Sequence, residues 1–271
     1  MCLNIDSCHY LRILGCHSMR VFTCGNSFED KMTCIYDAWE YALLHGHNNV
    51  RLMVEPVCQY SFAEEYVHVD VDAEKTNKVV RSIINSISYE AYLNVFYSTL
   101  FYEDTLDDIY RFLIVAFKVG SGVMRMLTDK AVMRIMEYRR KVGNEIHFSH
   151  EFIRFNSIDN KVYVAHYEPK CDIIYMTAMH FADRMPSECF VIIDDNRQYA
   201  VVHPADEDMY ITELTDEYML KLKETEYVND EYRSLWKEFF NSIGIKEREN
   251  YKCQRNMFPK WMRKHAVEFL D

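Results

Sequence analysis

Apolar residues recur every three or four positions through most of the first half of the chain, the spacing of amphipathic helices. This pattern predicts helices over about 27–44, 73–87, 88–100, 105–119 and 129–148. Ser27 with Asp30, and Thr105 with Asp108, have the spacing of a capping box at the start of two of these helices. A strand-like stretch at 21–24 precedes the first helix, and residues 50–72, which show little regular pattern, are expected to form short strands at most.

The period of the pattern changes after Ser149. Residues 152–156 and 162–168 alternate around a turn at 159–160, and residues 190–194 and 199–203 alternate around a turn at 195–196. A further strand is predicted at 210–214, a short helix at 172–186, and a helix at 235–243 whose strong apolar stripe is expected to lie in the core. Consecutive hairpins favour an antiparallel sheet. The sequence therefore predicts an α+β fold, with an antiparallel sheet from the C-terminal half packed against a helical N-terminal half.

These elements predict a single α+β domain over residues 19–271. Its parts are a mainly helical part at 19–150, a hairpin–helix–hairpin part at 151–214, and C-terminal helices with a basic arm at 215–271. Residues 1–18 show weak periodicity, and Met19 stands directly before the first strand. We expect this extension to lie outside the fold.

Composition narrows the class of protein. The chain has 271 residues and a net charge of −11, which disfavours nucleic-acid binding by the surface as a whole. No apolar run of about 18 residues is present, so we expect no membrane association. Nine cysteines, an odd number, occur without a secretory signal pattern, which favours free thiols and a cytoplasmic location.

Motifs for cofactor, metal or nucleophile chemistry are missing from the sequence. It contains no C-x-x-C pair, no G-x-S-x-G, no P-loop and no G-x-G-x-x-G. His147 and His150 have a spacing that suits two metal ligands on a helix, but no third ligand is evident, and His45-Gly46-His47 is best explained as a polar loop. We therefore expect no metal and no cofactor.

One polar group stands out on the apolar framework. His180 and Arg184 lie one turn apart on the helix predicted at 172–186, and Glu145, His147 and Glu168 lie on the elements expected to flank it. Imidazole, carboxylate and guanidinium groups together could perform acid–base chemistry or bind an anion. Glu145, His147, His180 and Arg184 are thus the catalytic candidates. The alternative is a buried hydrogen-bond network that fixes the sheet to the helix.

Basic residues gather at 111–141 and in the tail after Lys237, although the chain as a whole is acidic. Guanidinium groups pair with phosphates, amides read base edges and aromatic rings stack on bases. The alternative is solvated helix faces, with an arm that packs back on the core through its tryptophan. The candidates for nucleic-acid binding are Lys118, Arg139, Arg140, Arg154, Arg248, Asn250, Gln254, Arg255 and Trp261.

Several segments together match a known pattern. They are Phe117–Gly120, Arg140–Glu145 with His147, Phe152–Phe155, Glu168-Pro169, His180–Arg184, Trp236–Phe240, 243–250 and 254–259. In these segments, and in the opening strand and helix at 21–42, the chain resembles an uncharacterised bacterial family described as "probable DNA metabolism protein", a domain of unknown function. The similarity runs from about residue 20 to the end of the chain.

This resemblance implies a context without supplying catalytic residues. Members are typically encoded beside a radical SAM protein with a helix-hairpin-helix element, and some are similar to a segment fused to a uracil-DNA glycosylase-like domain. The expected function is that of an accessory protein in DNA repair or modification, which binds nucleic acid or docks the radical SAM partner. An enzyme that acts on nucleic acid or nucleotides through the Glu/His/Arg group, and a pure protein-interaction module, are the alternatives.

Overall fold

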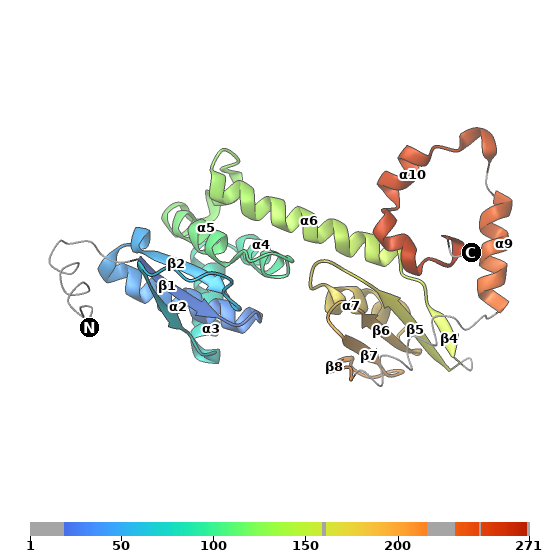
Figure 1. The fold of residues 1–271 in the computed structure, drawn as a ribbon, viewed down its shortest axis with the longest axis horizontal. Helices are drawn as coiled ribbons and strands as arrows, with labels where there is room; N and C mark the ends of the chain where they lie inside the picture. Colours follow the sequence, from blue (N-terminus) through green and yellow to red (C-terminus); the bar gives the residue numbers. More distant parts are fainter. Residues whose placement is uncertain (1–18, 159–160, 216–230, 244, 270–271) are drawn as a thin grey trace, which may run out of the picture. The chain divides into compact units, whose positions relative to one another are not determined.

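The computed structural model describes residues 19–269 except 159–160, 216–230 and 244. Contacts divide the chain into two compact units, one up to Arg140 and the other from Lys141. The division falls within helix α6 (Lys130–Phe152). The sequence predicts the end of the mainly helical part about ten residues later, at residue 150. The extension expected at 1–18 and the first residues of the predicted C-terminal part, 216–230, lie outside the described residues. Figure 1 colours the chain in sequence order.

The first unit contains a three-stranded parallel sheet in the order β2-β1-β3. Its strands are β1 (Met19–Cys24), β2 (Val50–Val54) and β3 (Glu64–His68). Parallel neighbours need a crossover connection, which α2 (Phe28–His45) supplies between β1 and β2. The strands β2 and β3 agree with the prediction of short strands, at most, over 50–72. The two strands are only five residues long, too short for alternation to show clearly.

Four predicted helices of this unit are confirmed: α2, α3 (Ala73–Ser86), α4 (Tyr89–Thr99) and α5 (Leu106–Val119). Ser27 and Asp30 form the predicted capping box. The capping box predicted at Thr105 is wrong, because the Thr105 hydroxyl donates to the Ser98 carbonyl over 2.8 Å. Asp104 instead accepts from the Leu106 amide, and Asp108 binds Arg134. Short 3-10 turns follow α2 at His47–Asn49 and α5 at Gly120–Arg125.

The hydrophobic core of the first unit combines β1 and β2 with helices α2 to α6. Met32 of α2, Leu52 of β2, Ile83 of α3 and Phe112 of α5 are fully buried in it. Burial of side chains of this size contributes about 1.5–3 kcal/mol each. The core thus fixes α5, whose polar residues reach β2.

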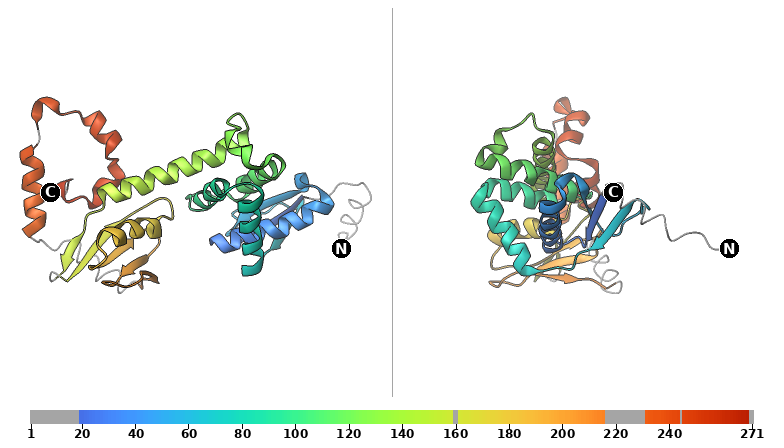
Figure 2. Two further views of the ribbon diagram at one scale, coloured as in Figure 1. Left: turned by 180° about the vertical axis from the view of Figure 1, so that it is seen from behind. Right: turned by 90° about the vertical axis from the view of Figure 1, so that its left-hand side faces the viewer.

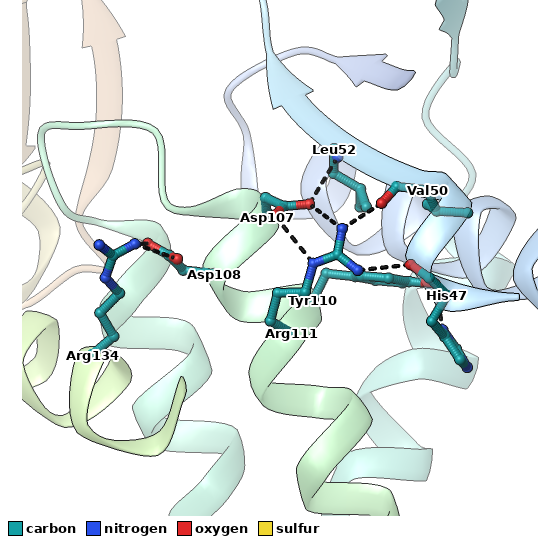
Figure 3. A network of polar contacts seen from close by, with 8 residues as sticks. All are labelled: His47, Val50, Leu52, Asp107, Asp108, Tyr110, Arg111 and Arg134. Carbon is teal, nitrogen blue, oxygen red and sulfur yellow. Dashed lines mark hydrogen bonds and ion pairs between the residues drawn. The ribbon is translucent and has the colours of Figure 1, made fainter. Parts of the chain in front are cut away.

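An arginine on α5 ties this helix to the start of β2 (Figure 3). The Arg111 guanidinium donates to the carbonyl of His47 over 2.7 Å and to the carbonyl of Val50. It also pairs with Asp107 at 3.2 Å, and the Asp107 carboxylate accepts from the Leu52 amide over 3.1 Å. One ion pair therefore satisfies backbone groups of the strand and of the turn before it.

The second unit contains a five-stranded sheet in the order β4-β5-β6-β7-β8. The strands are β4 (Asn156–Ile158), β5 (Val162–Tyr167), β6 (Cys189–Asp194), β7 (Tyr199–His203) and β8 (Tyr210–Glu213). The hairpin predicted around 195–196 is confirmed by β6 and β7. β4 and β5 also pair as antiparallel neighbours, but β4 covers 156–158 and not the predicted 152–156, because α6 extends to Phe152, and the turn predicted at 159–160 lies outside the described residues. The purely antiparallel sheet is corrected, because β5 and β6 are parallel. Helix α7 (Ile174–Arg184) is the crossover connection between the parallel strands β5 and β6. It covers one face of the sheet (Figures 1 and 2).

The predicted C-terminal helix is confirmed as α9 (Glu231–Ile243). The prediction that its apolar stripe lies in the core is wrong, because Leu235, Phe239 and Ile243 are 61%, 51% and 56% exposed. The remaining elements are α10 (Tyr251–Met257) and the 3-10 turns η3 (Lys246–Arg248), η4 (Lys260–His265) and η5 (Val267–Phe269). No helix among the described residues combines the length and the apolar character needed to cross a membrane.

We expect Arg111→Met to lower the free energy of unfolding by about 1–3 kcal/mol, because the substitution leaves the His47 and Val50 carbonyls without their charged donor. Urea unfolding followed by circular dichroism measures the change. Arg81→Met on α3 is the matched control, since Arg81 is exposed. Equal stability of the two variants would contradict the role assigned to Arg111.

Candidate functional site

Polar residues gather where the parallel strands β5 and β6 end. The register pairs Tyr167 with Asp194, so Glu168 and Asp195, the next residues, leave the sheet at the same edge. Ligands of sheets with parallel strands bind at this carboxyl edge. His166, the second-last residue of β5, holds its Nδ1 at 3.1 and 3.2 Å from the two carboxylate oxygens of Asp195. The side chains of His166 and Asp195 are 1% and 8% exposed.

The C-terminal arm completes this group. His265 of η4 places its Nε2 at 3.9 Å from Oε1 of Glu168, and the Lys264 ammonium contacts the same oxygen. Glu168, Asp195 and His265 each offer one ligand atom within 4.8 Å of the others. We call His166, Glu168, Asp195, Lys264 and His265 the carboxyl-end cluster. It brings together residues almost 100 positions apart in the chain.

Sequence reasoning found one member of this cluster and missed the others. The sequence pattern places Glu168 in the acid–base group and Asp195 in a turn, and it assigns no role to His265. The turn at Asp195 does exist, since β6 and β7 form a hairpin. A signal was available in the polar residues that follow two adjacent strands, but it points to a site only if those strands are parallel.

The loop between β5 and α7 is held from two sides. The Glu145 carboxylate on α6 accepts from the amides of Lys170 and Cys171, over 2.5 and 3.2 Å. Arg197 donates to the carbonyls of Pro169 and Lys170 and pairs with Asp194 at 2.9 Å. These contacts fix the backbone that carries Glu168.

Asp194, at the end of β6, is fully buried. Burial raises the pKa of its carboxyl group, and the Arg197 guanidinium opposes that rise. The carboxylate also accepts from the amides of Asn196 and Arg197, over 2.9 and 3.1 Å. Asp194 therefore shapes the turn that sets the position of Asp195.

The four catalytic candidates have separate surroundings. Glu145 is buried as the acceptor for the loop amides, and His147 is exposed and lies 3.1 Å from Glu151. His180 stacks on His150, with ring centroids 4.0 Å apart, and Arg184 is exposed. Their catalytic role stays a prediction, and Glu168 of the same predicted group lies in the carboxyl-end cluster.

The stacked histidines join α6 to α7. Burial, followed by the positive charge of a protonated His180, lowers the pKa of His150, although a hydrogen bond with the Met176 backbone opposes the change. Burial, followed by the charge of Arg184, lowers the pKa of His180. Both rings therefore favour the neutral form in the folded protein.

Several of the nucleic-acid candidates have structural contacts. Arg139 lies over the Tyr97 ring, with its Cζ 5.1 Å from the centroid, and Arg154 pairs with Glu268 at 2.7 Å. Asn250 caps α10 by accepting from the Cys253 amide. Trp261 packs against the small C-terminal core around Phe258. Of the remaining candidates, Lys118, Arg140, Arg248 and Arg255 are exposed, and Gln254 is half-buried.

Lys118 lies in an open depression of the first unit with a volume of about 1020 Å³. Residues of the α2–β2 turn, of α5 and of the start of α6 line it. Its ionisable residues are His45, His47, Arg111, Lys118, Asp129 and Lys130, and we call this surface the basic depression. Burial, followed by the positive charges of Lys118 and Arg111, lowers the pKa of His47. Figure 3 shows the contact between Arg111 and the His47 carbonyl, two residues of this lining.

Comparison with known proteins shows that residues 103–268 match a family described as a domain of unknown function, DUF4130. The chain belongs to the DUF4130 family. No curated protein matches it. The DUF4130 match begins just before α5 and contains Lys118, Lys130 and the entire carboxyl-end cluster, whereas β1 to β3 and α2 to α4 precede it.

We expect Glu145→Ala to destabilise the protein by about 1–3 kcal/mol, because it leaves the Lys170 and Cys171 amides without their charged acceptor. Glu151→Ala on the same helix is the control and should change stability by less than about 0.5 kcal/mol, since Glu151 is exposed. Urea unfolding of both variants decides the matter. A Glu145 variant as stable as the control would show that the loop does not need this acceptor.

The histidine stack should make stability depend on pH below neutrality. A histidine with a lowered folded pKa binds its proton more readily when unfolded, so unfolding is favoured as pH falls below the unfolded value of about 6.5. We therefore expect the wild type to lose stability from pH 7 to pH 5 more steeply than His150→Phe, which lacks one titrating ring. Thermal melts at half-unit pH steps measure the two slopes, and parallel slopes would refute the effect.

Proposed function

We propose that this DUF4130 protein is an accessory protein of DNA repair or modification that binds the phosphate backbone of nucleic acid at the basic depression. The observation that carries the proposal is the concentration of cationic side chains there on a protein whose net charge is −11. Phosphate binding needs a positive electrostatic field. A protein with a negative net charge can provide that field only where cationic side chains are concentrated on its surface.

The side chains of the depression divide into two groups. Arg111 is committed to Asp107 and to backbone carbonyls, so it contributes its charge from a fixed position. Lys118 and Lys130 are exposed residues of the lining, so their ammonium groups can reach a phosphate. The lowered pKa of His47, in part the effect of Lys118 and Arg111, is consistent with a positive field inside the depression. Asp129 caps the start of α6 by accepting from the Ala131 amide, so the carboxylate of the lining is itself engaged.

The resemblance to the "probable DNA metabolism protein" family supports nucleic acid as the ligand, in preference to a small anion. Phosphate contacts position a protein without reading sequence, so we expect weak base specificity. The exposed Arg248 and Arg255 of the C-terminal arm are a second cationic surface, which the experiment below separates from the first.

Fluorescence anisotropy with labelled single- and double-stranded oligonucleotides, over a range of salt concentrations, tests the proposal. We expect Lys118→Glu/Lys130→Glu to weaken binding at least tenfold and to reduce the salt slope by about one for each lost contact. Arg81→Glu, an exposed cation of α3 outside the depression, is the matched control, and Arg248→Glu/Arg255→Glu reports on the arm. Wild-type affinity in the depression variant, with both proteins folded, would refute the proposal.

Docking of a protein partner is the second candidate function, and the exposed apolar stripe of α9 favours it. Leu235, Phe239 and Ile243 present about half or more of their surfaces to solvent. Single exposed apolar residues are ordinary, whereas a contiguous stripe on one helix is typical of an interaction surface. The radical SAM protein implied by the resemblance is the partner we propose. Repeating the anisotropy measurements with that protein present separates binding by the chain alone from binding by a complex.

A further inference from the structure

We propose that the carboxyl-end cluster binds a divalent first-row transition metal ion through Glu168, Asp195 and His265. The proposal is independent of nucleic-acid binding at the basic depression, which lies in the other unit. It also differs from the His147 and His150 pair suggested by sequence spacing, since these two histidines contact Glu151 and His180.

The ligand atoms are already close together. One oxygen of Glu168, one of Asp195 and one nitrogen of His265 lie within 4.8 Å of one another. Metal–ligand bonds of about 2.0–2.2 Å hold neighbouring ligand atoms roughly 3–3.5 Å apart. Small rotations of the Glu168 and His265 side chains would close the difference. Two of the three ligands are well shielded from water, since the Asp195 and His265 side chains are 8% and 10% exposed.

The surroundings of Asp195 resemble those of a metal ligand. His166 lies against both carboxylate oxygens and is almost completely buried, so it holds the orientation of the carboxylate. Partners of this kind orient ligands in many metal sites. With one oxygen of Asp195 on the metal, the other can keep its contact with His166.

The backbone at Glu168 is also fixed in advance. Glu145 and Arg197 hold the loop that follows it, through amides on one side and carbonyls on the other. A site that is held before the ion arrives loses less conformational entropy on binding. The side chain of Glu168 remains 30% exposed, which leaves a path for the ion from solvent.

Lys264 explains how two carboxylates are tolerated at this edge without a metal. Its ammonium contacts Oε1 of Glu168, and its side chain is 61% exposed. A long exposed lysine can move into solvent at small cost when a divalent ion takes over its role as counter-charge. Lys264 therefore competes with the metal for Glu168.

The donor set indicates the type of ion. One imidazole and two carboxylates suit Mn²⁺, Fe²⁺ or Zn²⁺, and the cluster contains no thiolate that would favour softer ions. Three protein ligands leave coordination positions open, as in catalytic metal sites. An ion there could polarise a phosphate oxygen or activate a water molecule.

Isothermal titration of the chelator-treated full chain with MnCl₂ or ZnCl₂ tests the site, with Mn²⁺ electron paramagnetic resonance as a second readout. We expect Asp195→Asn and His265→Gln each to weaken binding at least tenfold. His147→Gln and Asp206→Asn are the matched controls, because both residues are exposed and lie outside the cluster. Circular dichroism confirms that each variant is folded.

Lys264→Met separates a metal site from a structural ion-pair network. In a metal site the substitution removes the competing cation, so we expect the affinity for Mn²⁺ to rise several-fold. In a structural network it only removes a contact, and neither ion binds. The proposal is overturned if wild type and Lys264→Met both fail to bind Mn²⁺ and Zn²⁺ at millimolar concentrations, or if binding is unchanged in Asp195→Asn and His265→Gln.

Discussion

The short loop after β5 depends on one buried charge, that of Glu145, and one partly buried charge, that of Arg197, and the polar edge of the second unit depends on the loop. Glu145 accepts from its amides, while Arg197 donates to its carbonyls. A loop of this kind would otherwise carry backbone groups without partners in a partly buried place. Because the charges satisfy both kinds of group, Glu168 leaves the sheet in a defined direction. A residue that looked catalytic in the sequence thus acts on the backbone next to the polar cluster.

The same use of charge recurs in the first unit. Arg111 donates to two carbonyls beside β2 in the way that Arg197 donates to two carbonyls beside β5. In both cases a carboxylate neighbour, Asp107 or Asp194, balances the guanidinium. Cations committed to the backbone in this way add to the local field but are poorly placed to contact a ligand. Exposed lysines such as Lys118 are better placed to do so, which is why the proposed phosphate contacts rest on them.

Local patterns in the sequence were enough to predict most elements, because helix stripes, capping residues and hairpin turns depend on near neighbours. Ser27 with its capping box and the hairpin around Asp195 are examples. What could not be predicted depends on pairing between distant segments. The parallel contact of β5 with β6 follows from the crossover through α7, and the approach of His265 to Glu168 joins the arm to the sheet. The stripe of α9 is a second case that the sequence could not settle. Periodicity predicts that a helix has an apolar face, but it does not predict whether another element covers that face, and this one is exposed.

The start of the DUF4130 match at residue 103 does not coincide with a boundary of folding. Phe112 and Leu113 of α5 lie inside the match, yet they are buried in a core to which Met32 and Leu52, outside it, also contribute. A fragment limited to 103–268 would carry α5 with its apolar face uncovered. Shared ancestry and independent folding thus have different limits in this chain. Any protein that inherits the family segment with α5 must provide, from elsewhere in its own sequence, a surface on which that helix can rest.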